Sequence, residues 1–181
     1  MEINQVKISD HYLIAKQMDQ VDYEDNFQLK TKALKNAPLT RDCMIAFFKS
    51  FSPMLIKLIL IRESIARKLG LKTANKTTSE ERNKALDEFE GNIGDSIAIF
   101  EVLDKNDTEL LTGQSDKHLD FRLSFISYQQ DDFNIVELAT TVKFHNVLGK
   151  IYFFIVKPFH RYFMRRILMR MKSKLVQATS N

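Results

Sequence analysis

The sequence predicts an α+β fold, with a curved antiparallel sheet packed on a long, kinked C-terminal helix. Residues 119–125 and 136–144 alternate apolar and polar side chains, which is typical of strands buried on one face. Residues 40–51 and 53–69 instead repeat apolar side chains at helical spacing, and residues 148–176 do so over a longer range. A strand, two short helices, an antiparallel meander and a final helix together give a sheet covered by helices on one side.

Length and composition fit one domain. The chain has 181 residues, of which 44% are hydrophobic and 28% charged, enough for a proper core. We expect a single domain over residues 1–181, with poor order in residues 1–20 and 177–181. Cys43 is the only cysteine, so no intramolecular disulfide can form. No cleavable signal opens the chain, and the longest clean apolar run, Ile151–Val156, is too short for a bilayer; we therefore expect a cytoplasmic protein.

The first half of the chain is predicted to form one strand and two helices. Residues 23–32 alternate well enough for the first strand. Thr40 suits a helix N-cap, and Pro53 suits the first position of a second helix that Gly70 closes. Residues 72–92 are polar, so we expect a mobile connection that carries one turn of helix or a short edge strand.

Four strands are predicted in the second half. Residues 96–103 and 108–112 form the first pair, and residues 113–116 turn the chain again. In the second pair, a register with Leu123 opposite Leu138 aligns the apolar faces of both strands and brings Asp120 near Lys143 and Arg122 near Glu137. We expect the apolar face to contact the C-terminal helix through Leu119, Phe121, Leu123, Phe125, Val136, Leu138, Val142 and Phe144.

The C-terminal segment carries two apolar stripes. At about 100° per residue they lie about 140° apart, with Pro158 between them, so a kink or break is expected. We expect the first stripe to pack on the sheet and the second to meet the two earlier helices, a second copy of the protein or a membrane, with the earlier helices as the default. The first stripe is Leu148, Ile151, Tyr152, Ile155, Phe159 and Tyr162, and the second is Phe163, Met164, Ile167, Leu168, Met171 and Leu175.

Charge is distributed unevenly. The net charge is +4, yet residues 148–181 contain eight lysines and arginines and no acidic residue. One interpretation is a solvated helix face with cations near a helix C-terminus. The other is attraction to an acidic lipid, nucleic acid or acidic partner.

Several motifs resemble a bacterial group, domain-of-unknown-function family 2867. They are Gly113–Arg122 (Gly-Gln-Ser-Asp-Lys-His-Leu-Asp-Phe-Arg), Phe144–Gly149, Lys157–Arg161 and Ile61–Gly70, and the resemblance extends from about Tyr23 to Lys174. That family is similar to the helix-grip domains, which include START lipid carriers, pollen allergens and aromatic polyketide cyclases.

The resemblance implies a cavity for an apolar ligand between the sheet and the C-terminal helix. The sequence shows about five clear strands where that fold has six or seven, with the gap near residues 72–92, which leaves closure of the cavity open. The resemblance implies no established activity. The residues expected to line the cavity are Phe121, Leu123, Phe125, Leu138, Val142, Phe144, Tyr152, Ile155, Phe159 and Tyr162.

Polar side chains supply few signs of chemistry. His118, Asp120 and Arg122 share one strand face, with Lys143 and His145 expected beside them. Such a group can hold an anion or transfer a proton, or it can be an exposed face with ordinary ion pairs.

His160 is a further polar candidate, as a structural or surface residue more often than a catalyst. The four histidines have no metal-ligand spacing, no phosphate-binding loop is present, and Cys43 has no histidine nearby in sequence. We therefore expect no metal and no cofactor.

Three classes of function remain, in order of preference. The first is a module that binds an apolar small molecule or lipid in the sheet–helix cavity. The second is a cyclase- or hydrolase-type enzyme that uses the same cavity. The third is an interaction protein whose basic C-terminal helix docks on an anionic membrane surface or a partner. Nucleic acid is not an expected partner, and the oligomeric state is left open.

Overall fold

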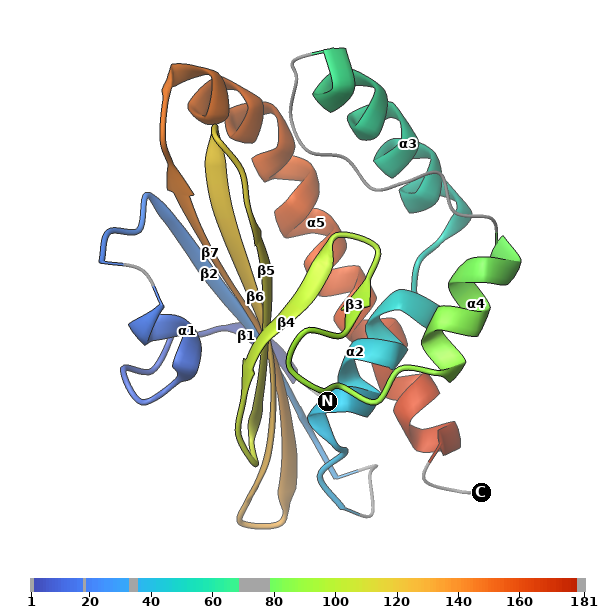
Figure 1. The fold of residues 1–181 in the computed structure, drawn as a ribbon. Coiled ribbons are helices and arrows are strands. Elements are labelled where there is room, and N and C mark those ends of the chain that lie inside the picture. Colours follow the sequence, from blue (N-terminus) through green and yellow to red (C-terminus); the bar gives the residue numbers. More distant parts are fainter. Residues whose placement is uncertain (1, 18, 33–35, 69–78, 179–181) are drawn as a thin grey trace.

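The computed structural model describes residues 2–17, 19–32, 36–68 and 79–178 (Figure 1). Seven antiparallel strands form one sheet in the order β1-β2-β7-β6-β5-β4-β3. The strands are β1 (Glu2–Gln5), β2 (Tyr23–Thr31), β3 (Ser96–Ile97), β4 (Phe100–Lys105), β5 (Glu109–Ser115), β6 (Leu119–Gln130) and β7 (Phe133–Phe144). The helices are α1 (Leu13–Lys16), α2 (Thr40–Lys49), α3 (Pro53–Lys68), α4 (Ser79–Asp87) and α5 (Val147–Ala178). The predicted α+β class, with a sheet and a long C-terminal helix, is confirmed.

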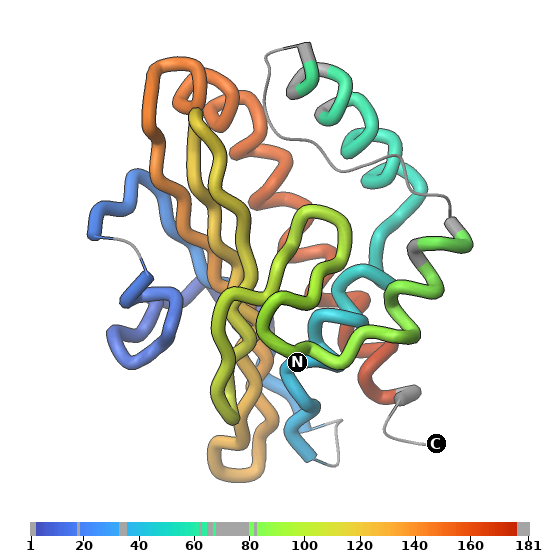
Figure 2. The backbone as a smooth tube through the Cα atoms, viewed as in Figure 1, coloured from blue at the N-terminus to red at the C-terminus, as the bar shows by residue number. Residues whose placement is uncertain are grey.

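The helices cover the two faces of the sheet unequally. Helices α2 to α5 lie on one side, while α1 lies on the other (Figures 1 and 2). Helices α2 and α5 pack on the sheet and on each other, through one large apolar cluster. The two short helices expected after the first strand are therefore α2 and α3.

The β6–β7 hairpin has a register two residues away from the predicted one. Leu123 lies opposite Thr140, and Leu138 lies opposite Phe125. The predicted pairing of Asp120 with Lys143 is correct, but Arg122 lies opposite Thr141. A shift of two residues leaves each side chain on its original face, so hydrophobic patterning does not distinguish the two registers. A tight turn, in which Asp131 has φ of 53°, fixes the observed one.

Several other boundaries also differ from the prediction. Residues 96–103 form two short strands with Ala98 at φ of 57° between them, and β5 continues through Gly113 to Ser115 where a turn was expected. Residues 1–20, expected to be poorly ordered, include β1 and α1, and residues 72–92 include α4. Thr40 is the first residue of α2 and not its N-cap as predicted; the N-cap is Leu39, which has no side chain able to cap the helix. The predicted helix end at Gly70 lies outside the described residues.

Helix α5 buries a different face from the one predicted for its first half. Tyr152 is buried, but Ile151, Ile155, Phe159 and Tyr162 are exposed. The prediction that the first stripe packs on the sheet is therefore wrong. The second stripe is buried against the sheet and α2, in agreement with the expectation that it meets the earlier helices. The buried face runs continuously through Tyr152, Phe153, Phe163, Met164, Ile167, Leu168, Met171 and Leu175.

Pro158 does not break α5, which is one helix of 32 residues. Pro158 is exposed on the side of α5 that faces away from the sheet, as are Phe154 and Phe159.

No single helix within the described residues has the length and apolar character needed to cross a membrane. The bent pair of α2 with residues 53–61, at 87°, meets that criterion by length and composition only.

The N-terminal segment covers the outer face of the sheet. The buried Glu109 carboxylate accepts hydrogen bonds from the backbone N–H groups of Leu13 (2.5 Å) and Ile14 (3.0 Å) and from the Ser124 hydroxyl. Ile14 is fully buried there. A second buried carboxylate, Glu137, accepts hydrogen bonds from Asn26, Gln28 and Tyr128. Glu109 thus anchors the segment before β2 to the sheet, while Glu137 of β7 joins β2 and β6.

Candidate functional site

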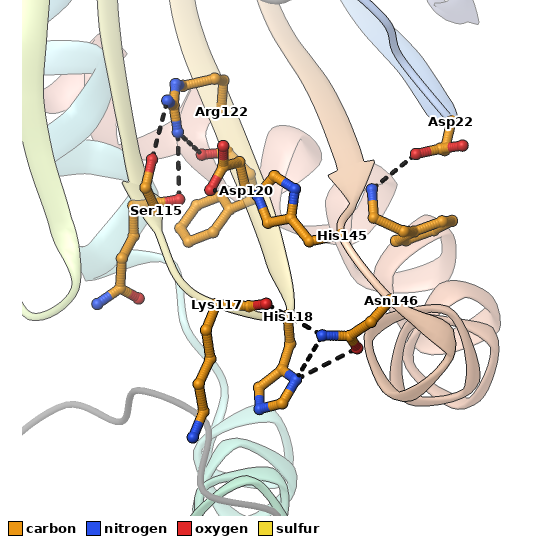
Figure 3. Close-up of polar contacts among 11 residues, drawn as sticks. Asp22, Ser115, Lys117, His118, Asp120, Arg122, His145 and Asn146 are labelled. Carbon is orange, nitrogen blue, oxygen red and sulfur yellow. Dashed lines mark hydrogen bonds and ion pairs between the residues drawn. The ribbon is translucent and has the colours of Figure 1, made fainter.

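Two of the motifs that carry the family resemblance, Gly113–Arg122 and Phe144–Gly149, meet where the β5–β6 turn contacts the start of α5 (Figure 3). Asn146 lies just before α5, and its side-chain oxygen accepts a hydrogen bond from the backbone N–H of Gly149 at 3.1 Å. Its amide group donates to the Lys117 carbonyl oxygen at 3.0 Å, and it also contacts Nδ1 of His118. Asn146 thus caps the helix and ties it to the turn.

Gly149 allows α5 to approach that turn closely. A Cβ atom at this position would lie 2.1 Å from the carbonyl oxygen of His118, which is far inside contact distance. The backbone N–H of His145 donates to the same oxygen at 2.9 Å. The short spacing between helix and turn therefore depends on glycine.

Arg122 is held by the backbone around it. Its guanidinium donates to the carbonyl oxygens of Gln114 and Phe121, at 3.1 and 2.9 Å, and to the Ser115 hydroxyl at 3.1 Å. Burial lowers the pKa of this guanidinium, and nearby Asp120 opposes that effect. The bonds to Gln114 and Ser115 join β6 to β5, while the bond to Phe121 stays within β6, so Arg122 serves the sheet.

Asp120 and His145 form an ion pair at 3.1 Å between their Oδ1 and Nε2 atoms. Both side chains are partly exposed, so the pair contributes modestly to stability. Of the predicted group, Asp120 contacts His145 and lies near Arg122, whereas His118 contacts Asn146. These contacts fix the helix and the two strands to each other.

His160 belongs to a separate cluster between β2 and α5. Its Nε2 atom lies 3.3 Å from the carboxylate of Asp25, whose side chain is completely buried. The Tyr23 hydroxyl donates to the same carboxylate, and burial followed by this hydrogen bond raises the pKa of Tyr23. Lys157 lies above the Tyr23 ring, 5.0 Å from its centroid. This cluster holds the middle of α5 on β2.

A hollow of about 470 Å³ opens beside this cluster, between α5 and the strands β1 and β2. Three arginines contribute to it, together with an amide side chain and three apolar side chains. Its lining residues are Gln5, Phe27, Arg161, Tyr162, Arg165, Arg166 and Met169.

Rings and an amide hold the three guanidinium groups in the hollow. Arg165 lies 5.5 Å from the Phe27 ring centroid and Arg166 lies 4.9 Å from that of Tyr162. Arg161 donates to the side-chain oxygen of Gln5 at 3.2 Å. No carboxylate among the described residues lies within 4.0 Å of any of these guanidiniums. Among the described residues, no ion pair therefore neutralises these three guanidinium groups.

The predicted cavity residues divide into three groups. Leu123, Phe125, Leu138, Val142 and Tyr152 are buried, Phe121 and Phe144 are partly buried, and Ile155, Phe159 and Tyr162 are exposed on the outer side of α5. Among these residues, only Tyr162 contributes to the hollow.

Within the described ranges, no group of three or more His, Cys, Asp or Glu side chains is placed to hold a metal ion. Cys43 is fully buried in α2, and burial raises the pKa of its thiol from 9.0 to about 12.

Sequence reasoning missed Asp25 and the arginine group as site residues. Asp25 occupies an inward position of β2, between Tyr23 and Phe27, and an acid at such a position is a signal of a buried polar partner. The arginines were expected only as part of a basic helix face, because their grouping in a hollow depends on which face of α5 is buried.

Comparison with known proteins identifies the family. The model of the protein family of unknown function DUF2867 matches residues 17–167. No curated protein and no solved structure matches the chain. The matched range includes β2, the junction of β5, β6 and α5, and most of the arginine-lined hollow. The chain belongs to the DUF2867 family.

Proposed function

We propose that the protein binds a small amphiphile, an apolar chain with an anionic head, in the hollow between α5 and the β1–β2 edge. The observation that carries the proposal is the group of three arginines that no described carboxylate neutralises, placed beside apolar side chains. A guanidinium binds a carboxylate or phosphate through two parallel hydrogen bonds. The arginines would therefore select the anionic head.

The rest of the hollow supports an apolar chain. Phe27 is fully buried at its base, while Tyr162 and Met169 are exposed along α5. The volume of about 470 Å³ falls within the range of small-molecule sites. An amphiphile fits this mixture of charge and apolar surface better than a purely apolar or purely ionic ligand does.

This location differs from the cavity expected between the sheet and the inner face of α5. Phe125, Leu138, Leu168 and Met171 meet in that seam, and all four have no exposed surface. The ligand class expected from the helix-grip resemblance is kept, and the site moves to the outer edge of the same two elements. His160 and Asp25 do not line the hollow, so we propose binding and no reaction.

Paired probes test the proposal by calorimetry on the full chain. Dodecanoate and dodecanol have the same chain and differ in the head group, so the proposal requires dodecanoate to bind more tightly. The double variant Arg161→Gln/Arg165→Gln should weaken dodecanoate binding about tenfold or more, because each charged hydrogen bond contributes about 1.5–3 kcal/mol.

The matched control is Lys172→Gln/Lys174→Gln, which removes the same charge from the same helix outside the hollow. If both double variants weaken binding equally, only the net charge of α5 matters. Equal affinity for dodecanoate and dodecanol, or no binding of either, would exclude the proposed site. Native mass spectrometry of the purified protein would show whether a ligand of this class is retained.

A further inference from the structure

Exposed apolar side chains concentrate on two helices. Among the described residues, thirteen large hydrophobic side chains are exposed; seven belong to α5 and three to α3. Phe154 is 79% exposed, the highest value of the thirteen. A soluble surface normally scatters such residues singly, and a contiguous group indicates a contact surface.

The first half of α5 is apolar on two opposite sides. Tyr152 and Phe153 face the sheet and are buried, while an outer face carries Val147, Ile151, Phe154, Ile155 and Phe159. At about 100° per residue, positions 147, 151, 154 and 155 fall within roughly 100° of arc, opposite the buried side, and Phe159 lies about 40° beyond Ile155 at the edge of that arc. We call these five residues the outer face. They form one stripe along the helix and need a partner of their own.

Positive charge surrounds this stripe. Lys150 is exposed beside the outer face, and Arg161, Arg165 and Arg166 are exposed at its C-terminal end. From Val147 to the end of the chain the sequence contains no aspartate or glutamate. An apolar stripe on a helix whose charged side chains are all cations is the pattern of a helix that lies in the surface of an anionic membrane.

We infer that the outer face of α5 docks on an anionic lipid bilayer. Phe154 and Ile151 enter the boundary between head groups and acyl chains, and the flanking cations contact lipid phosphates. The helix lies in the plane of the surface, since its opposite side is occupied by the sheet.

Charge argues against a second copy as the partner. A symmetric dimer through this face would place one α5 against another, and each carries eight cations between Leu148 and the end of the chain. Without acidic residues on the same segment, the two helices repel each other. A bilayer with anionic lipid supplies both the apolar volume and the opposite charge.

A tryptophan reporter gives a direct test, because the chain has no tryptophan. The variant Phe154→Trp places the only indole at the most exposed position of the outer face. Its emission should shift to the blue, and brominated acyl chains should quench it, with vesicles of phosphatidylcholine and phosphatidylglycerol in equal parts. Vesicles of phosphatidylcholine alone should produce a much smaller change, and added salt should weaken the response.

Substitutions then locate the contact by co-sedimentation with the same vesicles. Phe154→Ser should weaken binding about tenfold or more, the loss expected when a buried aromatic side chain is removed. The control Ile93→Ser changes another strongly exposed apolar residue, 63% exposed and outside α5, and should bind as the native chain does. Thermal unfolding of each variant checks that the fold is retained.

Three outcomes would overturn the inference. They are no binding to either vesicle at low salt, binding that Phe154→Ser leaves unchanged, and a concentration-dependent dimer that Phe154→Ser abolishes. Because none of the five outer-face residues lines the hollow, dodecanoate binding by Phe154→Ser should stay normal. Failure of the membrane inference is thereby separated from failure of the proposed ligand site.

Discussion

The side chain of Arg122 on β6 lies across Gly113, its partner on β5. A Cβ atom on Gly113 would lie 2.6 Å from Cδ of Arg122 and 2.5 Å from the carbonyl oxygen of Phe121. The second contact is with backbone, which cannot turn aside as a flexible side chain does. The glycine therefore determines both the path of the arginine and the spacing of the two strands.

Gly113→Ala should destabilise the protein by about 2–4 kcal/mol, because the strands must separate and the Arg122 hydrogen bonds weaken. Urea unfolding followed by circular dichroism measures the change. Gly94→Ala is the control, since a Cβ there meets nothing within 4 Å and only the φ of +93° is strained; its cost should be about 1 kcal/mol. Equal effects would show that the close approach at Gly113 is unimportant.

Asp120→Asn should lower the free energy of unfolding by less than about 1 kcal/mol, because its ion pair with His145 is partly exposed. Calorimetry with dodecanoate should give the affinity of the native chain, since Asp120 does not line the hollow. Loss of dodecanoate binding at unchanged stability would instead place the junction of β5, β6 and α5 in the binding site.

Shortening a side chain should destabilise the protein strongly on the buried side of α5 and hardly at all on its exposed side. Leu168 has no exposed surface, so Leu168→Ala should cost about 2–5 kcal/mol. Ile155 is 55% exposed, and Ile155→Ala should stay within about 0.5 kcal/mol of the native value. Urea unfolding of the two variants compares them directly, and a large loss for Ile155→Ala would contradict the observed orientation of the helix.

Glu109→Gln should loosen the N-terminal segment. An amide keeps the shape of the side chain but loses the charge that the Leu13 and Ile14 N–H groups contact, a loss of about 1.5–3 kcal/mol. Hydrogen exchange at these two amides should accelerate. Glu101→Gln, on the exposed part of β4, is the control and should leave their exchange rates unchanged.

Stability should fall in alkaline solution, and Cys43 should contribute to the fall. Below about pH 9 its thiol is protonated in the folded and unfolded states alike. Between pH 9.0 and about 12 the unfolded chain releases the proton while the buried thiol retains it, so ionisation favours unfolding. Cys43→Ala removes this term, and its urea midpoint should depend less on pH from 9 upward. The same slope in both proteins would contradict the prediction.

Sequence patterning predicted those elements whose two faces differ in polarity. Strands β6 and β7 were correct because apolar and polar residues alternate, but their register was not determined, since a shift of two residues preserves both faces. In α5 the residues around Ile151, Tyr152 and Phe154 are apolar all round, so periodicity could not separate the buried side from the exposed one.

The elements that were missed depend on contacts distant in sequence. Helix α1 has only four residues, and its N-terminal amides are bound by Glu109 of β5. Gly113 was taken for a turn because glycine is common in turns, whereas here it accommodates Arg122 within a strand. The arginine-lined hollow was missed because it combines α5 with β1, which the sequence did not predict.

The pairing of β2 with β7 has a consequence for how the chain is made. Tyr23 pairs with Val142, so these partners are separated by 142 − 23 = 119 positions. During synthesis β2 and the apolar helix α2 leave the ribosome long before β7 and α5 exist to cover them. Contacts of such long sequence separation form slowly, because a large loop must close first. The nascent chain therefore passes through a period in which Phe47, Phe48 and the edge of β2 are open to solvent, and protection by chaperones is most valuable then.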